Sequence, residues 1–336
     1  MEHTAYLGYA AGVFTSLLWA LTSICFAAGG RRIGPTLVNG LRLYVAIVLL
    51  TGALWASTGS PLPDVNDRMV LLLAASSIVG IVIGDQALFT AFVDIGPRLS
   101  LLMMATAPIW AALAGWLFLD ETLGGAALVG IAVTIGGVAW VILERPHTRV
   151  DDRPHPHRVR GIVLALVGAV CQGGGLLLSK AGMGHGWLPE DEHLGTLAAT
   201  QVRIAVAILC MTPVLFARWR FTAGKPEHKI PRRIFWIGFG FTALGALVGP
   251  FLGMWMSLVT ADLTSVGVAQ TLCSLAPVFV LPMVLLQGER VSPRAFVGAV
   301  VAIGGVALLV FLPGATGPRE SGPPVSLGGA WHPQHR

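Results

Sequence analysis

Charged side chains are scarce in this chain. Of its 336 residues, only 12% are Asp, Glu, Lys or Arg, whereas 54% are hydrophobic. A soluble domain usually carries roughly 25% charged residues, and the mean hydropathy of +0.74 lies well on the apolar side. The composition excludes an ordinary soluble domain and predicts an integral membrane protein, in which lipid is the solvent for most of the chain.

Common enzyme signatures are also missing from the sequence. It contains no Gly-x-x-x-x-Gly-Lys-Ser/Thr phosphate loop, no His-Glu-x-x-His motif and no Gly-x-Ser-x-Gly motif. We therefore expect no catalytic residues, no cofactor and no nucleic acid partner. Without a nucleotide-binding loop, direct use of ATP by this chain is not expected either.

Candidate metal ligands are few. The four cysteines all fall inside apolar stretches, where a thiol behaves as a small hydrophobe: Cys25, Cys171, Cys210 and Cys273. Three histidines lie in one polar segment among arginines: His147, His155 and His157. We expect neither a disulfide nor a metal site, and interpret the histidine segment as a solvated basic loop.

Long apolar stretches dominate the chain instead. A bilayer core about 30 Å thick needs roughly 20 apolar residues at 1.5 Å rise per residue. Ten stretches of this kind occur, at 7–28, 34–56, 69–92, 98–118, 125–143, 161–181, 195–216, 234–258, 264–286 and 294–312. The first lacks a preceding positive charge and is too long for a cleavable signal. We predict an all-α integral membrane protein with ten transmembrane helices.

The two halves of the chain repeat each other. The segment 129–139 recurs as 297–307 with every glycine retained, and Ala107-Pro108 recurs as Ala276-Pro277. Further matches join Asp120-Glu121-Thr122 to Gly288-Glu289-Arg290, Arg42-x-x-x-Ala46 to Arg203-x-x-x-Ala207, and Gly80-x-x-x-Gly84 to Gly245-x-x-x-Gly249. Five helices per copy is an odd number, so the second copy enters the membrane from the opposite side. Inverted repeats of this kind are a common transporter architecture.

The predicted domains follow from this repeat. Residues 1–143 form the first five-helix repeat and residues 161–312 the second. A polar, basic linker at 144–160 joins them, and the Gly- and Pro-rich tail at 313–336 is predicted to be disordered.

These repeated features resemble the EamA branch of the drug/metabolite transporter superfamily, from about residue 7 to residue 312. They are the mid-helix proline, the short turn containing Glu, the following Gly-Gly helix, and the Arg-x-x-x-Ala helix of each half. The resemblance implies a ten-helix carrier, often an exporter of amino acids or related metabolites, with the fifth and tenth helices peripheral to a central cavity. The chain departs from the family pattern in its long 144–160 linker and its weakly charged 57–68 loop.

Three charged residues lie deep within apolar spans. They are Arg42, Asp85 and Arg203, whereas Lys180 sits near a helix end from which it could reach the surface. A charge at the bilayer centre costs about 2.5–3.5 kcal/mol, so these residues are expected to face the bundle interior. Consecutive helices are antiparallel, and Arg42 and Asp85 therefore lie at similar depth. A pair between them would either hold two helices together or belong to a solute site.

The second repeat offers no such acid to Arg203. Matching the two Gly-x-x-x-Gly pairs places Pro250 at the position equivalent to Asp85. Arg203 must then bind Asp85, a helix carbonyl, water or an anionic group of a solute. Gln172 and Gln270 add neutral hydrogen-bonding groups within the spans, either as ligands for a solute or as interhelical contacts.

Helix-breaking residues mark matching places in the two halves. Pro108 and Pro277 each remove the hydrogen bond to the carbonyl four residues earlier, and broken helices at corresponding positions point to the solute site of a transporter. Gly173, Gly174 and Gly175 are expected to loosen the 161–181 helix in the same way. The alternative is a fixed bend without motion.

Tryptophans and basic loops bear on the cavity and on the orientation. Trp19 and Trp255 either line an aromatic cavity or face the lipid interface. Most Lys and Arg residues outside the spans lie in the loops after the odd-numbered helices, so the positive-inside rule predicts that both termini are external. The family resemblance implies cytoplasmic termini instead.

The sequence thus predicts a multi-pass protein of the plasma or inner membrane that transports a small solute across the lipid bilayer, with protons as a possible coupling ion. A receptor-like scaffold or an intramembrane enzyme would be the alternative. A scaffold, however, needs sizeable exposed domains, and an enzyme needs paired acids or a nucleophile within the membrane. If transport is coupled to protons, Asp85 is the expected coupling residue.

Overall fold

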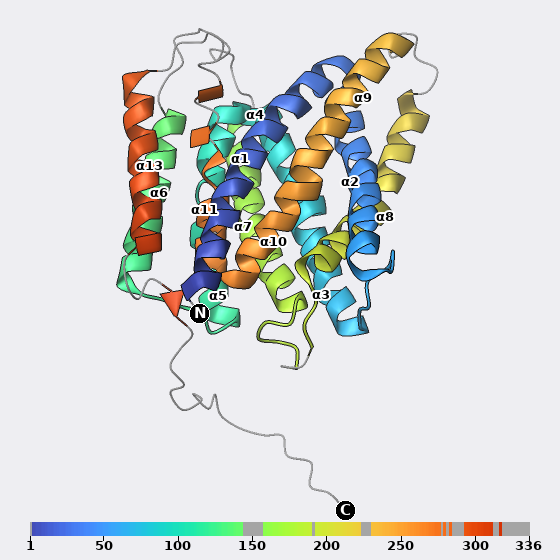
Figure 1. The fold of residues 1–336 in the computed structure, drawn as a ribbon. Coiled ribbons are helices and arrows are strands. Elements are labelled where there is room, and N and C mark those ends of the chain that lie inside the picture. Colours follow the sequence, from blue (N-terminus) through green and yellow to red (C-terminus); the bar gives the residue numbers. More distant parts are fainter. Residues whose placement is uncertain are drawn as a thin grey trace, which may run out of the picture.

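The chain forms a bundle of helices in a computed structural model (Figure 1). The structure describes residues 2–143, 157–189, 192–222, 230–276, 278–279, 282–283, 292–311 and 316–317. The helices of the first half are α1 (Glu2–Ile33), α2 (Pro35–Thr58), α3 (Asp67–Ser77), the π-helix η1 (Ile78–Gly84), α4 (Asp85–Met104), α5 (Ala107–Phe118) and α6 (Gly125–Leu143). Those of the second half are α7 (Arg158–Gly182), α8 (Thr196–Thr222), α9 (Arg232–Ala246), the π-helix η3 (Leu247–Gly253), α10 (Met254–Leu263), α11 (Val266–Cys273) and α13 (Pro293–Phe311).

Several of these helices are suited to a bilayer. Within the described residues, six helical segments are long and apolar enough to span it: 5–33, 37–58, 67–88, 158–182, 196–217 and 232–263. Three shorter apolar helices accompany them, at 107–118, 125–141 and 296–308. The all-helical, membrane-spanning character predicted from composition is confirmed.

One predicted helix boundary is wrong. The ends of the apolar stretches predict a connection at 93–97, but α4 continues through this segment to Met104. Ala91 and Ile95 of α4 are buried against Ala165 of α7. Packing of this apolar stripe extends the helix beyond the point at which hydropathy alone would end it.

A two-stranded sheet joins the end of the chain to the first half. Strand β1 (Thr122–Leu123) pairs antiparallel with β2 (Thr316–Gly317), with Thr122 opposite Gly317. Residues 316 and 317 of the segment 313–336 are thus paired through their backbone groups, and the disorder predicted for this segment stays a prediction. The rest of that tail, and residues 144–156 of the predicted linker, lie outside the described residues.

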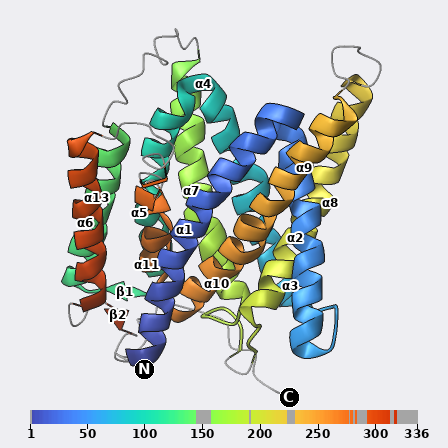
Figure 2. The same ribbon diagram turned by 45° about the horizontal axis from the view of Figure 1, so that its top comes forward.

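Each half packs against the other in a matching way (Figure 2). Helix α1 lies along α9, η3 and α10, and α7 lies along α3, η1 and α4. In the same manner α2 packs on α8, α5 on α11 and α6 on α13. Helices α2, α5 and α6 thus contact their own counterparts, whereas α1 and α7 each pack on the segment that follows the second helix of the other repeat, as expected for two related repeats that share one core.

The repeated Gly-Gly helices form one of these contacts. A Cβ at Gly137 of α6 would overlap the backbone of Ala302 on α13, and one at Gly305 would lie 2.5 Å from the Thr134 nitrogen. Glycine is needed here because the two backbones approach so closely. Helices α6 and α13 lie together at one edge of the bundle, in the peripheral position that the family resemblance implies (Figure 1).

The two π-helices occupy matching places in the two repeats. The segment 78–84 reads Ile-Val-Gly-Ile-Val-Ile-Gly and the segment 247–253 reads Leu-Val-Gly-Pro-Phe-Leu-Gly. Aligning them makes Met254 the counterpart of Asp85. The alignment of Asp85 with Pro250, made from the sequence, is wrong. It matched Gly80-x-x-x-Gly84 to Gly245-x-x-x-Gly249, whereas the π-helices match it to Gly249-x-x-x-Gly253. The conclusion that the second repeat has no acid at this position stands.

Helix breaks also occur at matching places. The chain leaves helical geometry at residues 105–106, just before Pro108, and again at 274–275, just before the position of Pro277. Each break is closed by a short turn, in which the Ile109 amide donates to the Thr106 carbonyl and the Val278 amide donates to the Leu275 carbonyl, both at 2.9 Å. The break predicted at Pro108 is therefore present, while Pro277 itself lies outside the described residues.

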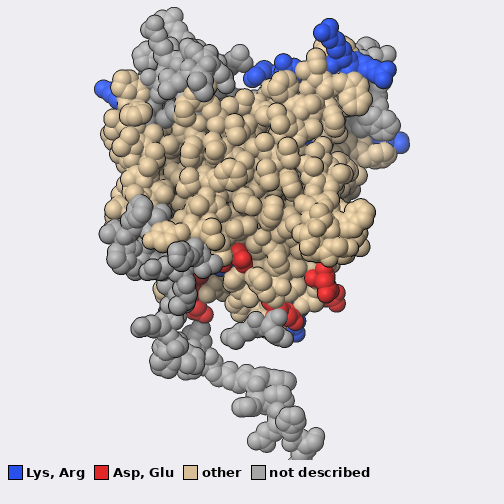
Figure 3. Space-filling view, viewed as in Figure 1, with Lys and Arg blue, Asp and Glu red and all other residues tan. Residues whose placement is uncertain are grey.

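Charges separate to opposite ends of the bundle (Figure 3). Lys and Arg gather at the end where α1 stops and α9 begins, which carries Arg31, Arg32, Arg232 and Arg233. Asp and Glu gather at the other end, where α1 begins in Figure 1. The wide belt between them shows few charges on the visible face, as the hydrocarbon region of a bilayer requires.

Candidate functional site

An ion pair within the bundle joins α2 to the first residue of α4. Arg42 of α2 donates from Nη2 to Oδ2 of Asp85 at 2.8 Å, and the two side chains are 9% and 18% exposed. Gln172 of α7 approaches the other carboxylate oxygen, with its Nε2 3.5 Å from Oδ1. The Arg42 guanidinium also lies 5.7 Å from the centre of the Phe26 ring. The structure thus brings together three of the residues singled out from the sequence, on three different helices.

Arg203 of α8 lies beside this pair. Its side chain interacts electrostatically with Asp85, and a Cβ added at Gly80 of η1 would lie 3.5 Å from its Nη2. The residue is only 6% exposed, and its Nε has no hydrogen-bond partner among the described residues. No ion pair of Arg203 with any described residue is present. The group therefore holds two guanidinium charges and one carboxylate.

A second polar atom in this region also lacks a partner. Asn39 lies three residues before Arg42 on α2, and its buried Oδ1 accepts no hydrogen bond from the described part of the chain. Buried polar groups are normally satisfied, and an exception calls for an explanation such as a bound ligand or water. Two buried atoms, one donor and one acceptor, are thus left available near the same ion pair.

The backbone around the group is built from closely packed glycines. Asp85 directly follows η1, and π-helical segments often occur at functional sites. A Cβ at Gly175 of α7 would lie 2.9 Å from the Gly80 Cα, so α7 and η1 touch backbone to backbone. This contact sets Gln172, one turn earlier on α7, beside Asp85.

The three consecutive glycines of α7 do not interrupt the helix. Helix α7 runs from Arg158 to Gly182 without a break. A Cβ at Gly173 would lie 2.7 Å from the Ala111 nitrogen of α5, while Gly174 has only an ordinary contact at 3.9 Å. The glycines therefore allow close packing in this structure, and their predicted role in loosening the helix stays a prediction.

The two tryptophans singled out from the sequence lie on α1 and α10. Trp255, on α10, lines a pocket of about 880 Å³ at the end of the bundle where α2 stops and α8 begins, and donates from Nε1 to Thr196 Oγ1 at 3.1 Å. Trp19 of α1 packs against η3, since a Cβ at Gly253 would lie 3.7 Å from its ring. The Gln270 side chain makes no hydrogen bond to this group of residues in the described part of the chain.

A second buried ion pair was not predicted. Lys180, expected to reach the surface, is instead 8% exposed and donates from Nζ to Oε1 of Glu121 at 2.7 Å. Glu121 Oε2 accepts from the Val266 amide at 2.8 Å. The repeated Glu-containing turn could have signalled this role. Glu121 joins the first repeat to α7 and α11 of the second.

The fold and these residues together define the class of protein to which the chain belongs. An all-helical membrane bundle of two packed repeats, with charged residues buried between them, is the architecture of a multi-pass membrane transporter. Comparison with known families makes the assignment more specific. The model of the EamA-like transporter family matches residues 6–143 and 159–311, and the chain belongs to this family. It is thus a transporter of the drug/metabolite transporter type that acts on a small molecule, and its family is not one of enzymes.

Comparison with individual proteins gives information on the fold only. A crystal structure described only as that of a protein superimposes with a TM-score of 0.69 at 16% sequence identity, covering 90% of this chain and 94% of that one. No curated protein matches the chain. The comparisons therefore show the family and the fold, and the chemical class of the solute has to be inferred from the side chains of the site.

Proposed function

We propose that this protein is a secondary transporter of small metabolites that carry an anionic group, such as amino acids or related compounds. Ten spans arranged as two inverted repeats would expose the site around Arg203 alternately to each side of the plasma or inner membrane. The helix breaks before Pro108 and at 274–275, in corresponding places of the two repeats, support a site between them.

The observation that carries this proposal is the buried Arg203 guanidinium. A charge held at the bilayer centre costs about 2.5–3.5 kcal/mol, and the single carboxylate nearby already pairs with Arg42 at 2.8 Å. A carboxylate on the solute would supply the missing negative charge and form charge-assisted hydrogen bonds with the guanidinium. Asn39 Oδ1, which is buried and accepts no bond within the described residues, is suited to an ammonium or hydroxyl group of the same solute.

Asp85 is proposed as the coupling residue if protons drive transport. Paired with Arg42, the carboxylate is held in its charged form, since a nearby opposite charge favours ionisation. Separation of α2 from α4 during the transport cycle would remove this stabilisation and allow protonation. In this proposal, the breaking of one ion pair accompanies the uptake of one proton.

Solute recognition is tested by reconstituting the protein in liposomes with Arg203→Gln. We expect the apparent KM for carboxylate-bearing metabolites to rise at least about tenfold, the equivalent of one lost charge-assisted hydrogen bond, with little change for an uncharged solute. The matched control is Arg294→Gln, because Arg294 lies on the exposed first turn of α13. Equal KM values for carboxylate substrates in wild type and Arg203→Gln would refute recognition by Arg203.

A further inference from the structure

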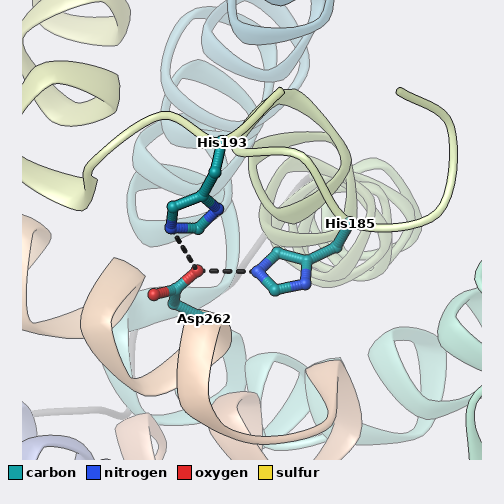
Figure 4. A group of neighbouring side chains, drawn as sticks. All are labelled: His185, His193 and Asp262. Carbon is teal, nitrogen blue, oxygen red and sulfur yellow. Dashed lines mark hydrogen bonds and ion pairs between the residues drawn. The ribbon is translucent and has the colours of Figure 1, made fainter. Parts of the chain in front are cut away.

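A group of metal-ligating side chains lies outside the ion-pair site. His185 and His193, from the connection between α7 and α8, converge with Asp262 from the last turn of α10 (Figure 4). His185 Nε2 lies 2.7 Å from Asp262 Oδ1, and His193 Nε2 lies 4.0 Å from the same oxygen. One ligand atom from each residue lies within 4.8 Å of the other two.

The backbone is shaped to bring the two histidines together. His185 is flanked by Gly184 and Gly186, which adopt φ values of 111° and 88°. A Cβ at Gly184 would overlap the Glu192 carbonyl oxygen, so only glycine allows the two arms of the connection to cross. The Leu194 amide donates to the Met183 carbonyl at 3.0 Å and fixes this crossing.

The distances fit a metal ion after small side-chain adjustments. Zinc bonds of about 2.0–2.1 Å in a tetrahedral site place neighbouring ligand atoms roughly 3.3 Å apart. The observed separations of 2.7 Å and 4.0 Å lie on either side of this value. The His193 side chain is 55% exposed and free to rotate toward the other two ligands.

We propose that His185, His193 and Asp262 form a binding site for Zn²⁺. Two imidazoles and one carboxylate are a donor set that suits zinc, with a water molecule in the fourth position. The site does not depend on the proposed solute or on the coupling ion, because none of its residues belongs to the Arg42, Asp85 and Arg203 group.

Zinc at this place would fix the rim of the pocket that Trp255 lines. Residues 194–198 follow His193 directly and form one side of that pocket. The ion would tie this segment, through His193, to the end of α10. Occupancy of the site therefore constrains the connection between α7 and α8 at the end of the bundle where α2 stops and α8 begins.

The test is zinc titration of the purified full chain in detergent, with a histidine-free affinity tag and after treatment with a chelator. Isothermal titration calorimetry should show one Zn²⁺ bound per chain. His193→Gln and Asp262→Asn should each weaken that binding by more than about tenfold, since even the loss of an outer-shell partner costs 10–100-fold. The matched control is the double variant His157→Gln with His228→Gln, which should bind as wild type does.

Two further outcomes decide the proposal. X-ray absorption of the zinc-loaded protein should show two imidazole ligands, and one in His193→Gln. Because His193 is exposed, this variant should still elute as a single species on gel filtration, which separates loss of binding from loss of fold. No zinc binding by wild type, or equal affinity in wild type and His193→Gln, would overturn the assignment.

Discussion

At the scale of single residues, the Arg42–Asp85 pair is the feature most open to experiment. Asp85 is the only acid that the sequence places deep within an apolar span, and the structure pairs it at 2.8 Å with a buried guanidinium. Asp85→Asn keeps the size of the side chain and its ability to accept a hydrogen bond from Arg42, but removes the group that would bind a proton. We expect this variant to fold and to transport with a flattened dependence on pH.

The measurement is uptake into liposomes with an imposed pH difference, compared between wild type and Asp85→Asn. Gln172→Leu is a useful companion, because Gln172 contacts the same carboxylate without titrating. It should change the rate while preserving the dependence on pH. If purified Asp85→Asn still concentrates the solute against its gradient, coupling does not run through Asp85, and the pair with Arg42 is a structural contact between α2 and α4.

Residues also show where prediction from sequence fails. Arg42, Asp85 and Arg203 were recognisable because charges are rare in apolar spans. The histidine group was not, since His185 and His193 lie in a connection and Asp262 belongs to a different helix, so only the fold brings them together. The prediction for Lys180 was wrong because a long side chain near a helix end can reach either the surface or a buried partner. Here the buried partner is Glu121, with which Lys180 forms an ion pair.

At the scale of elements, the break before Pro108 invites a direct test. Pro108 cannot donate to the Met104 carbonyl, and the chain leaves helical geometry at residues 105–106. Pro108→Ala supplies the missing N–H and should join α4 to α5 more rigidly. We expect slower transport with unchanged insertion into the membrane, measured as initial uptake rates normalised to protein in the bilayer.

The companion substitution is Pro277→Ala, at the corresponding place in the second repeat. A proline outside these breaks, Pro213 within α8, provides the control. Transport rates that do not change in either Pro108→Ala or Pro277→Ala would show that the breaks are fixed bends, the alternative left open by the sequence.

The contact between α4 and α7 predicts a dependence of stability on pH. Asp94 of α4, outside the apolar span 67–88, accepts two hydrogen bonds from Arg160 at 2.7 and 2.8 Å. The bond from Arg160 lowers the pKa of the Asp94 carboxyl below its usual range. A lowered carboxyl pKa means that the stabilisation is complete above the unfolded value of about 3.9 and is lost as pH falls through the folded pKa.

Asp94→Asn should therefore unfold at a lower temperature than wild type near pH 6, and the difference should shrink as the pH falls below about 4. Tryptophan fluorescence of the detergent-solubilised protein during heating reports this. Arg160→Gln should have a similar effect, and the double variant should add little to either single change. A difference between wild type and Asp94→Asn that is the same at every pH would contradict the role of the ion pair.

Most elements could be predicted from the sequence, for stated physical reasons. Spans appear as apolar stretches, and the close contact of α6 with α13 follows from the repeated glycines. The π-helices η1 and η3 could not be found in this way, because a fully apolar segment carries no pattern that separates π from α periodicity. Because glycine pairs recur in these apolar segments, the sequence also allowed Asp85 to be aligned with Pro250, whereas the π-helices align it with Met254.

At the scale of the whole molecule, charge asymmetry predicts the orientation in the membrane. Basic residues gather at one end and acidic residues at the other, where α1 begins (Figures 1 and 3). The positive-inside rule places the basic end in the cytoplasm. A cysteine introduced near Met1 should then react with a membrane-impermeant maleimide in intact cells, whereas Ile230→Cys at the basic end should react only after permeabilisation.

The native cysteines must be replaced in both proteins so that the introduced thiol alone is measured. They are Cys25, Cys171, Cys210 and Cys273, and each is partly buried in the bundle. Labelling near Met1 that needs permeabilisation would reverse the assignment and agree with the cytoplasmic termini implied by the family resemblance.

The replacement of Asp85 by Met254 in the second repeat has a thermodynamic consequence for the proposed transport cycle. In an inverted repeat, exchanging the conformations of the two halves turns an inward-facing protein into an outward-facing one. If the halves were chemically identical, the two states would have equal energy, and neither would be preferred at rest. Here only one half carries the carboxylate, so the exchange does not reproduce the same electrostatic energy. On the proposed cycle, we therefore expect the empty transporter to prefer one resting side, set by its own sequence before any gradient acts on it.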